Sequence, residues 1–400
     1  MATMRSIRSF SVRRGALALV AAAAVALLAT GAPSQELAKE LADKLTPEQR
    51  KIYLDYSKAK DLHDKRHKAY WLRVEAKRDA RRAKRLLGQQ YEAEDYIAQQ
   101  PPKYSGAELP AEIAKIVTEI RPPVPVPPLP TVSDFLAHAK ALYGFEPTLT
   151  TEQYFKRSYA QEALAVGLTK DQVVRIYALE TGGQGTYDMQ SGFNPLTKQG
   201  RAISSALGYA QLLHANSVGE LVKHGESFAR RLLAMASTPG TPPERAESLR
   251  AKAAILRRML KAARTVPNEW GEHVKFAGTP PGLGIHALNL DADVGPWLQV
   301  LKLKALKDEA AAAGRESLAG SEIELMNLAG PRTGLEMMTP VAHNMPTANF
   351  FSEGGYYRNT IVREKTAAEL LSALNDRMEV NIKKPGAVEF AQIFDEVAKR

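Results

Sequence analysis

The chain has 400 residues, of which 24% are charged and 44% hydrophobic; its net charge is +10 and it contains no cysteine. This composition is typical of a soluble globular protein, not of a disordered or multi-span membrane protein, and the length suits about two structural units. The absence of cysteine excludes thiol nucleophiles, disulfide frameworks, Cys-ligated zinc and iron–sulfur clusters, so any chemistry must use carboxylates, histidine, hydroxyl groups or amides.

Residues 1–32 have the pattern of a signal peptide. An apolar run from 16 to 29 follows four arginines, at positions 5, 8, 13 and 14. This run is shorter than the roughly 20 residues that a transmembrane helix needs. We therefore expect an exported protein, periplasmic or associated with the cell envelope, and an uncleaved N-terminal anchor is the alternative. Without the four arginines the net charge is +6.

Residues 33–120 predict a helical, partly basic arm. Between 36 and 100 glycine and proline are rare, which favours a long helix, and Pro101, Pro102 and Pro110 are expected to end it. From Lys65 to Arg85 ten Lys and Arg stand against two acidic residues, a net +8. Such a stretch attracts polyanions, which for an exported protein are anionic wall polymers and lipid headgroups. We expect the arm to position the domain on wall polymers or on cell-envelope proteins, and we expect no nucleic acid partner. A solvated helix face is the other interpretation.

A proline-rich linker at 121–131 is expected to separate this arm from a domain at 132–400. In this domain Ser or Thr is repeatedly followed three residues later by Glu or Gln, the spacing of a helix-capping box. Strand-like alternation is scarce, so the predicted fold class is mainly α. The predicted caps are Thr169 with Gln172, Ser217 with Glu220, Thr241 with Glu244, Ser321 with Glu324, and Thr366 with Glu369.

The helix predicted after Thr169 carries the strongest candidate for chemistry, Glu180. Val173, Ile176, Tyr177 and Glu180 follow one another at helical spacing, so the carboxylate lies on the apolar stripe in the last turn. Burial and the negative end of the helix dipole both disfavour the charged form, so the pKa of Glu180 should rise, as a general acid requires. The alternative is a last-turn Glu that reaches solvent past the following glycines.

The residues around Glu180 resemble the lytic transglycosylases of the lysozyme-like superfamily. The similarity lies in ALETGG at 178–183, SGFNP at 191–195, GYAQLLHANS at 208–217 and, more loosely, ELMNLAGPRTG at 324–334. It implies a lysozyme-like helical catalytic domain with a helical insertion at about 220–315. Glu180 would be the catalytic acid/base, and the candidate substrate-binding residues are Thr181, Asn194, Gly208, Tyr209, Gln211 and Asn327.

The Gly208–Gln211 segment also suits a sugar groove on physical grounds. The amide of Gln211 can both donate and accept hydrogen bonds from an amino sugar, and Gly208 allows close approach of a polymer. Tyr209 could stack on a sugar ring. The alternatives are that Tyr209 packs in the core and that Gln211 is an amide that ties the loop together.

The resemblance implies that the enzyme cleaves the MurNAc–GlcNAc bond of peptidoglycan glycan strands with a single glutamate and forms a 1,6-anhydro product. Two alternatives stay open: a lysozyme-like hydrolase that uses Glu180 with Asp188 as second carboxylate, and a non-catalytic peptidoglycan-binding scaffold. The family's third motif carries a tyrosine where this chain has Met326 or Asn327. Tyr356 and Tyr357 are the other tyrosines considered for this role.

No cofactor or metal is expected. His286, Asp291 and Asp293 match no tight set of metal ligands, and an ordinary loop with a helix cap at Asp293 explains them. The chain also has no phosphate-binding glycine motif and no convincing dinucleotide fingerprint.

Overall fold

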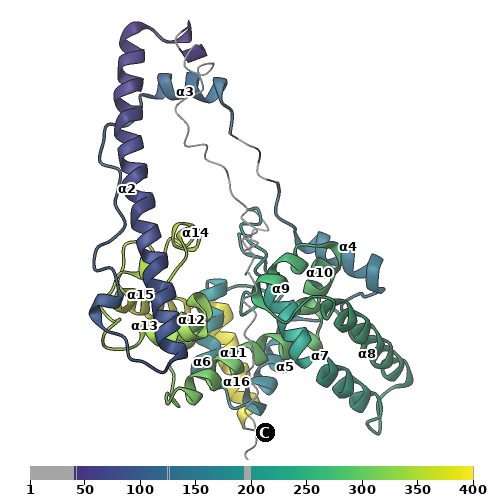
Figure 1. Ribbon diagram of the computed structural model, residues 1–400. Coiled ribbons are helices and arrows are strands. Elements are labelled where there is room, and N and C mark those ends of the chain that lie inside the picture. The colour runs from purple at the N-terminus through teal and green to yellow at the C-terminus, as the bar shows by residue number, and fades with distance from the viewer. Residues whose placement is uncertain (1–39, 42, 124, 126, 193–199, 400) are drawn as a thin grey trace, which may run out of the picture. The chain divides into compact units, whose positions relative to one another are not determined.

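A computed structural model describes residues 40, 41, 43–123, 125, 127–192 and 200–399. This part of the chain is mainly helical, as its composition predicts, and the only β pairing within it consists of isolated bridges (Figure 1). The predicted signal peptide at 1–32 lies outside the described residues. No described helix is long and apolar enough to cross a membrane.

The chain divides into two compact units, and the division falls inside the predicted arm. Unit 1 comprises residues up to 60 together with 106–124, and unit 2 comprises 61–105 and 125–400. The helix α2 (Pro47–Leu86) contributes its first residues to unit 1 and the rest to unit 2. It ends well before the prolines at 101 and 102, because Gly88 adopts φ 67° and the Gln89 N–H bonds back to the Lys84 carbonyl.

Unit 1 is small. Apart from its share of α2 it contains α3 (Ala111–Ile120), and its core consists of Leu41, Leu45 and Ile113. Partly buried apolar side chains of Tyr53, Leu109, Ile116, Val117 and Ile120 pack around this core.

In unit 2 the second part of α2 packs into the main hydrophobic core rather than standing free in solvent. Tyr70, Trp71 and Val74 are buried there. Arg81, which belongs to the basic stretch, is also buried, and its Nε donates to Glu336 at 2.7 Å. Its other nitrogens donate to the backbone carbonyls of Asp95 and Asn349. Tertiary contacts therefore include this half of the predicted arm in the larger unit.

The rest of unit 2 is an assembly of helices with short connections. Figure 1 shows α5, α6 and α16 together near its centre, where α16 packs on both of the others. The elements are η1 (Ala93–Asp95), α4 (Val132–Tyr143), α5 (Glu152–Ala165), α6 (Lys170–Thr181), α7 (His214–Ala236), α8 (Pro243–Ala263), α9 (Trp270–Ala277), α10 (Pro280–His286), η2 (Ala287–Leu290), α11 (Val294–Ala312), α12 (Gly320–Ala329), α13 (Pro331–Met337), η3 (Thr347–Asn349), α14 (Glu353–Arg358), α15 (Ala367–Asn381) and α16 (Pro385–Ala398).

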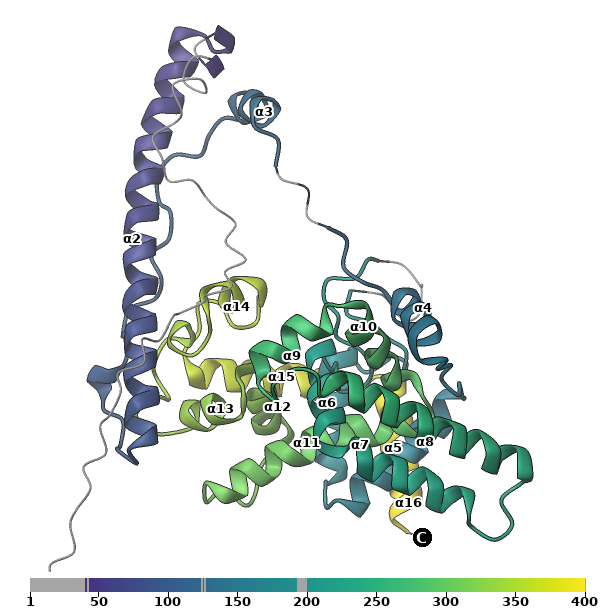
Figure 2. The same ribbon diagram turned by 45° about the vertical axis from the view of Figure 1, so that its right-hand side comes forward.

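The predicted insertion at about 220–315 is only partly separate from the rest of unit 2. The helices α7 and α8 lie side by side as a projecting hairpin (Figure 2). In contrast, α10 packs on α4, and α11 packs on α5 and α12. The Lys252 ammonium on α8 bonds Asp291 at 2.7 Å and Thr148 at 3.1 Å, which ties the hairpin to the segments before α5 and α11.

Candidate functional site

Helix α6 places Glu180 where the sequence predicts it. The helix begins at the capping box of Thr169 and Gln172, whose reciprocal bonds measure 3.0 and 3.2 Å. It ends at Gly182, which adopts the left-handed conformation at φ 67°. Val173, Ile176 and Tyr177 are buried on the same face, and Glu180 is half-buried in the last turn.

A second carboxyl group meets Glu180 at this point. Glu324 on α12 is 3% exposed, and its carboxyl group is hydrogen-bonded to that of Glu180. The Asn327 amide, one turn further along α12, lies 3.4 Å from Glu324 Oε2. We call Glu180 and Glu324 the carboxyl pair.

The pKa of each member of the carboxyl pair is raised, and burial is the largest cause for both. Burial raises the pKa of Glu180 to about 7, against the opposing effects of the hydrogen bond from Glu324 and the charge of Arg377. The pKa of Glu324 lies well above its ordinary value, first because of burial and then because of the negative charge of Glu180. The pair therefore retains a proton at neutral pH, and Glu324 binds it more tightly than Glu180 does.

Two cations act on this pair from neighbouring helices. Arg377 on α15 favours the charged form of Glu180, and Lys302 on α11 favours that of Glu324. Burial lowers the pKa of Lys302, and the nearby carboxylate of Glu220 opposes that shift. Glu220 is itself 2% exposed, and its Oε1 accepts from Lys223 at 2.9 Å.

Glu324 and Glu220 do not belong to capping boxes, so the prediction from their spacing to Ser321 and Ser217 is wrong. Ser217 lies inside α7 and Ser321 inside α12, so neither serine is a cap and both glutamates are free to point into the interior. A signal for Glu324 does exist in the sequence, because Glu324 and Asn327 are three residues apart and therefore share one helix face. Of the predicted substrate-binding residues that the structure describes, Asn327 is the one that bonds to the carboxyl pair.

The turn at 208–211 is held by its own hydrogen bonds. Gly208 adopts φ 80°, and a Cβ there would lie 2.3 Å from Nε2 of the buried Gln299. Gln211, at φ 42°, donates from Nε2 to the carbonyls of Gly208 at 2.8 Å and Met189 at 3.1 Å. The amide of Gln211 thus ties the loop, as in the alternative interpretation, and glycine is required at 208 for packing against Gln299.

Tyr209 and Thr181 are directed into the protein. Tyr209 is 1% exposed and packs among Phe155, Tyr177 and Phe390, with its hydroxyl group bonded to the Glu152 carboxylate. Its ring is therefore part of the core and offers no face to a sugar. The Thr181 hydroxyl donates to the Tyr177 carbonyl at 2.6 Å within α6.

Where the structure describes them, the remaining predicted positions form no hydrogen bond with the carboxyl pair. Asp188 is exposed, accepts a hydrogen bond from Thr186, and is not among the groups that shift the pKa of Glu180. Asn194 lies outside the described residues. Met326, at the position of the family's tyrosine, is fully buried. The hydroxyl group of Tyr357 bonds to His67, and both this tyrosine and Tyr356 line a separate cavity.

A serine–histidine contact elsewhere in unit 2 is structural. The Ser217 hydroxyl lies 2.8 Å from His286 Nδ1, and His286 Nε2 lies 2.7 Å from the Ser205 carbonyl. Both side chains have no exposed surface, and burial lowers the pKa of His286 to about 3. Asp291 and Asp293 pair with Lys252. Among the described residues no group of three or more His, Asp or Glu side chains is arranged to hold a metal ion.

Comparison of the chain with protein-family models, with curated proteins and with solved structures finds no match. The function of the chain is therefore inferred from the geometry and chemistry of its own residues.

Proposed function

We propose that the protein is an exported peptidoglycan lytic transglycosylase that cleaves the MurNAc–GlcNAc glycosidic bond and leaves a 1,6-anhydro product. One observation carries this proposal: the half-buried carboxyl group of Glu180, with its pKa raised to about 7, is hydrogen-bonded to the buried carboxyl group of Glu324. A general acid is most effective when its pKa lies near the working pH. The resemblance of 178–183 and 324–334 to the family motifs supports the same assignment.

Glu180 acts twice in the proposed reaction. Its protonated form gives its proton to the glycosidic oxygen while the C1–O bond breaks and the bonding electrons pass to that oxygen. Its carboxylate form then takes the proton from the C6 hydroxyl group, and O6 bonds to C1. Glu180 ends protonated, as it began, and no water is consumed.

Glu324 supports both steps without touching the reacting atoms. Because Glu324 holds its proton more strongly, it donates a hydrogen bond to the Glu180 carboxylate that forms after the first step. This bond stabilises the charged intermediate form of the acid in a buried environment. Asn327 orients Glu324 through its amide, so both residues act as positioning residues for Glu180.

The hydrogen bond within the pair argues against a hydrolase that uses two carboxylates. In such enzymes the two carboxyl groups lie about 5 to 10 Å apart, on either side of the scissile bond. Two groups that are hydrogen-bonded to each other leave no room for a sugar between them. They act as one acid site, which favours the single-glutamate mechanism. Asp188 is exposed and does not influence Glu180, so it gives the hydrolase little support.

The proposal also includes export and a location in the periplasm or cell envelope. It further includes binding of wall polymers or envelope proteins through the basic residues. They rest on the sequence of 1–32 and on the charge of 65–85.

The decisive experiment is incubation of the mature protein with peptidoglycan sacculi and identification of the released fragments by mass spectrometry. The wild type and the Asp188→Asn control should both release anhydro-muropeptides, and Glu180→Gln should release none. Reducing-end products that depend on Asp188 would instead establish a hydrolase. Co-sedimentation of the protein with sacculi without release of any fragment would favour the non-catalytic binding scaffold.

A further inference from the structure

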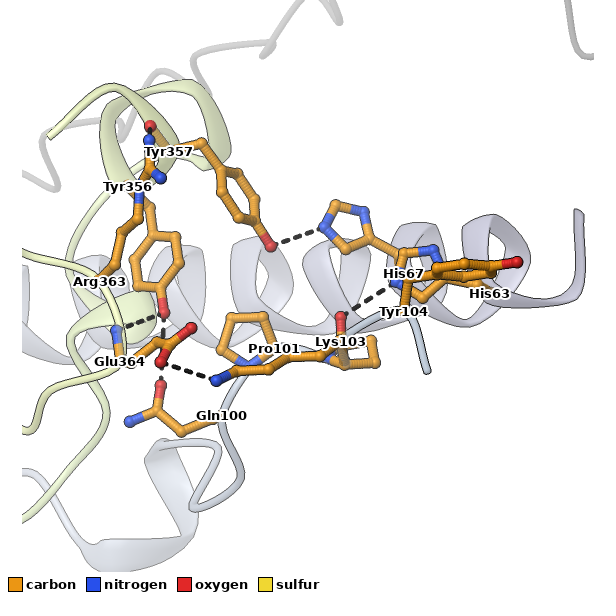
Figure 3. Close-up of a pocket in the computed structure, with 11 residues that line it drawn as sticks. His63, His67, Gln100, Pro101, Lys103, Tyr104, Tyr356, Tyr357, Arg363 and Glu364 are labelled. Atoms are coloured by element: carbon orange, nitrogen blue, oxygen red, sulfur yellow. Dashed lines mark hydrogen bonds and ion pairs between the residues drawn. The ribbon is translucent and has the colours of Figure 1, made fainter. Parts of the chain in front are cut away.

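A cavity of about 280 Å³ lies within unit 2, outside the carboxyl pair. Figure 3 shows that it is open to solvent and is lined by one face of α2, the segment 100–104, and the chain from α14 to residue 364. Its volume is near the lower end of the range of about 300–1,000 Å³ found for ligand sites. It therefore suits a ligand with a single ring.

Aromatic rings form the walls of this cavity. His63 and His67 lie one turn apart on α2, and the Tyr104 ring meets His63 edge-on with centroids 5.6 Å apart. Tyr357 stands opposite, with its hydroxyl group 2.8 Å from His67 Nε2. The indole of Trp71 also donates to His67 Nε2, at 3.2 Å. Because indole is only a donor, His67 Nε2 accepts this bond, and its Nδ1 lies 3.5 Å from the Glu353 carboxylate.

The other end of the cavity is polar and carries charges of both signs. The Lys103 ammonium and the Glu364 carboxylate pair at 2.7 Å, and the Gln100 amide lies beside them. The guanidinium of Arg363 is turned onto the backbone carbonyl of Tyr357. The cavity thus presents donors and acceptors together at an edge that solvent reaches, since the Lys103 and Glu364 side chains are 67% and 58% exposed.

Glu364 is held in an unusual backbone conformation. Its φ is 59°, a left-handed value that non-glycine residues adopt infrequently. Its backbone N–H donates to the Tyr356 hydroxyl group at 2.8 Å, which fixes this conformation. Strained positions of this kind concentrate at binding and active sites, and here the strain places the carboxylate against Lys103.

We propose that this cavity binds one sugar ring. A sugar ring has apolar faces that match the tyrosine and proline walls, and hydroxyl groups around its edge that can bond both Lys103 and Glu364. A purely apolar ligand would cover these polar groups without replacing their hydrogen bonds to water. The site is separate from the bond-cleaving chemistry, and the proposed function serves only to choose the probe.

The test is a titration of the full-length protein with N-acetylglucosamine, followed by saturation-transfer NMR and by tryptophan fluorescence. Trp71 reports on the cavity because its ring lies 6.0 Å from that of Tyr357. Glu364→Gly should weaken binding at least about tenfold, since a hydrogen bond to a charged group is lost. Glycine adopts this φ without strain, so the variant remains folded.

Two control variants separate the possible outcomes. Glu316→Gly makes the same change in an exposed loop between α11 and α12 and should leave sugar binding unchanged. Glu180→Gln should also bind the sugar as the wild type does, so this proposal can fail or succeed independently of the proposed function. The absence of saturable binding would overturn it, as would binding that Glu180→Gln abolishes and Glu364→Gly leaves intact. Preference for the proline-rich peptide PPVPVPPLP over the sugar would also overturn it.

Discussion

The carboxyl groups of Glu180 and Glu324 are hydrogen-bonded to each other across the contact between α6 and α12. Since both are buried from bulk solvent to a large degree, the first proton that leaves the pair is bound more weakly than the second. The pKa of Glu180 thus depends on a partner on another helix, about 140 positions away in sequence, as well as on the position of Glu180 in α6.

Replacement of Glu324 should reveal its hydrogen bond through the pH dependence of turnover. Because the proton donor must be Glu180 in its neutral form, kcat/KM should fall as the pH rises through about 7. Glu324→Leu removes the bond that stabilises charged Glu180, so the midpoint should move upward by roughly one pH unit. Glu324→Gln keeps a donor and should leave the midpoint near that of the wild type. Identical midpoints in both variants would refute the role of Glu324.

The same pKa shift predicts how stability depends on pH. Glu180 binds its proton more tightly in the folded state, with a pKa of about 7, than in the unfolded state, with a pKa of about 4.5. Its contribution is therefore complete below pH 4.5 and is lost as the pH rises to 7. Between pH 4.5 and pH 8 the free energy of unfolding of the wild type should fall by on the order of 1–3 kcal/mol more than that of Glu180→Gln. Urea unfolding at the two pH values tests this, and parallel losses would contradict it.

Arg81 should be far more important for stability than its neighbour Arg82. Arg81→Ala leaves the carboxylate of Glu336 buried without its 2.7 Å partner, so we expect a loss of about 3–5 kcal/mol. Arg82 is exposed and pairs only with the exposed Asp79, so Arg82→Ala should change stability by less than about 0.5 kcal/mol. Denaturant unfolding of the two variants measures the difference. Equal effects would mean that the interior ion pair does not hold α2 in unit 2.

Gly208 and Gly314 provide a matched test of packing at the 208–211 turn. Both adopt left-handed φ values, 80° and 83°, but a Cβ at 314 meets nothing within 4 Å, whereas at 208 it meets Gln299. Gly314→Ala should therefore cost only the conformational term, about 1–2 kcal/mol. Gly208→Ala should cost about 1–3 kcal/mol more, because the core side chain must move. The midpoints of thermal unfolding compare the two, and similar values would show that Gln299 yields freely.

The sequence predicted the parts of the site that depend on local signals. Thr169, Gln172 and Gly182 define both ends of α6, and helical spacing places Glu180 on its buried face. Local signals could not place Glu324 in the site, because Ser321 followed by Glu324 has the spacing of a helix cap. Only the packing of α12 against α6 shows that the carboxyl group of Glu324 points inward. The sequence could not tell whether Tyr209 packs in the core or faces a sugar groove, because a tyrosine in this turn fits both positions.

The predicted arm shows a similar limit. Its helical character and basic charge follow from composition, and α2 confirms the helix. Composition does not reveal that Arg81 has a buried acidic partner 255 positions later in the chain. Tertiary contacts such as this ion pair place the second part of the helix in unit 2.

The interior position of Arg81 also reduces the positive charge that the basic stretch presents to solvent. Lys65, Arg66, Lys68 and Arg73 are exposed. Towards the end of the stretch Arg81 is neutralised by Glu336, and Lys84 by Asp95. An anionic polymer that approaches α2 would therefore meet a smaller net charge than the +8 counted along the sequence of this stretch.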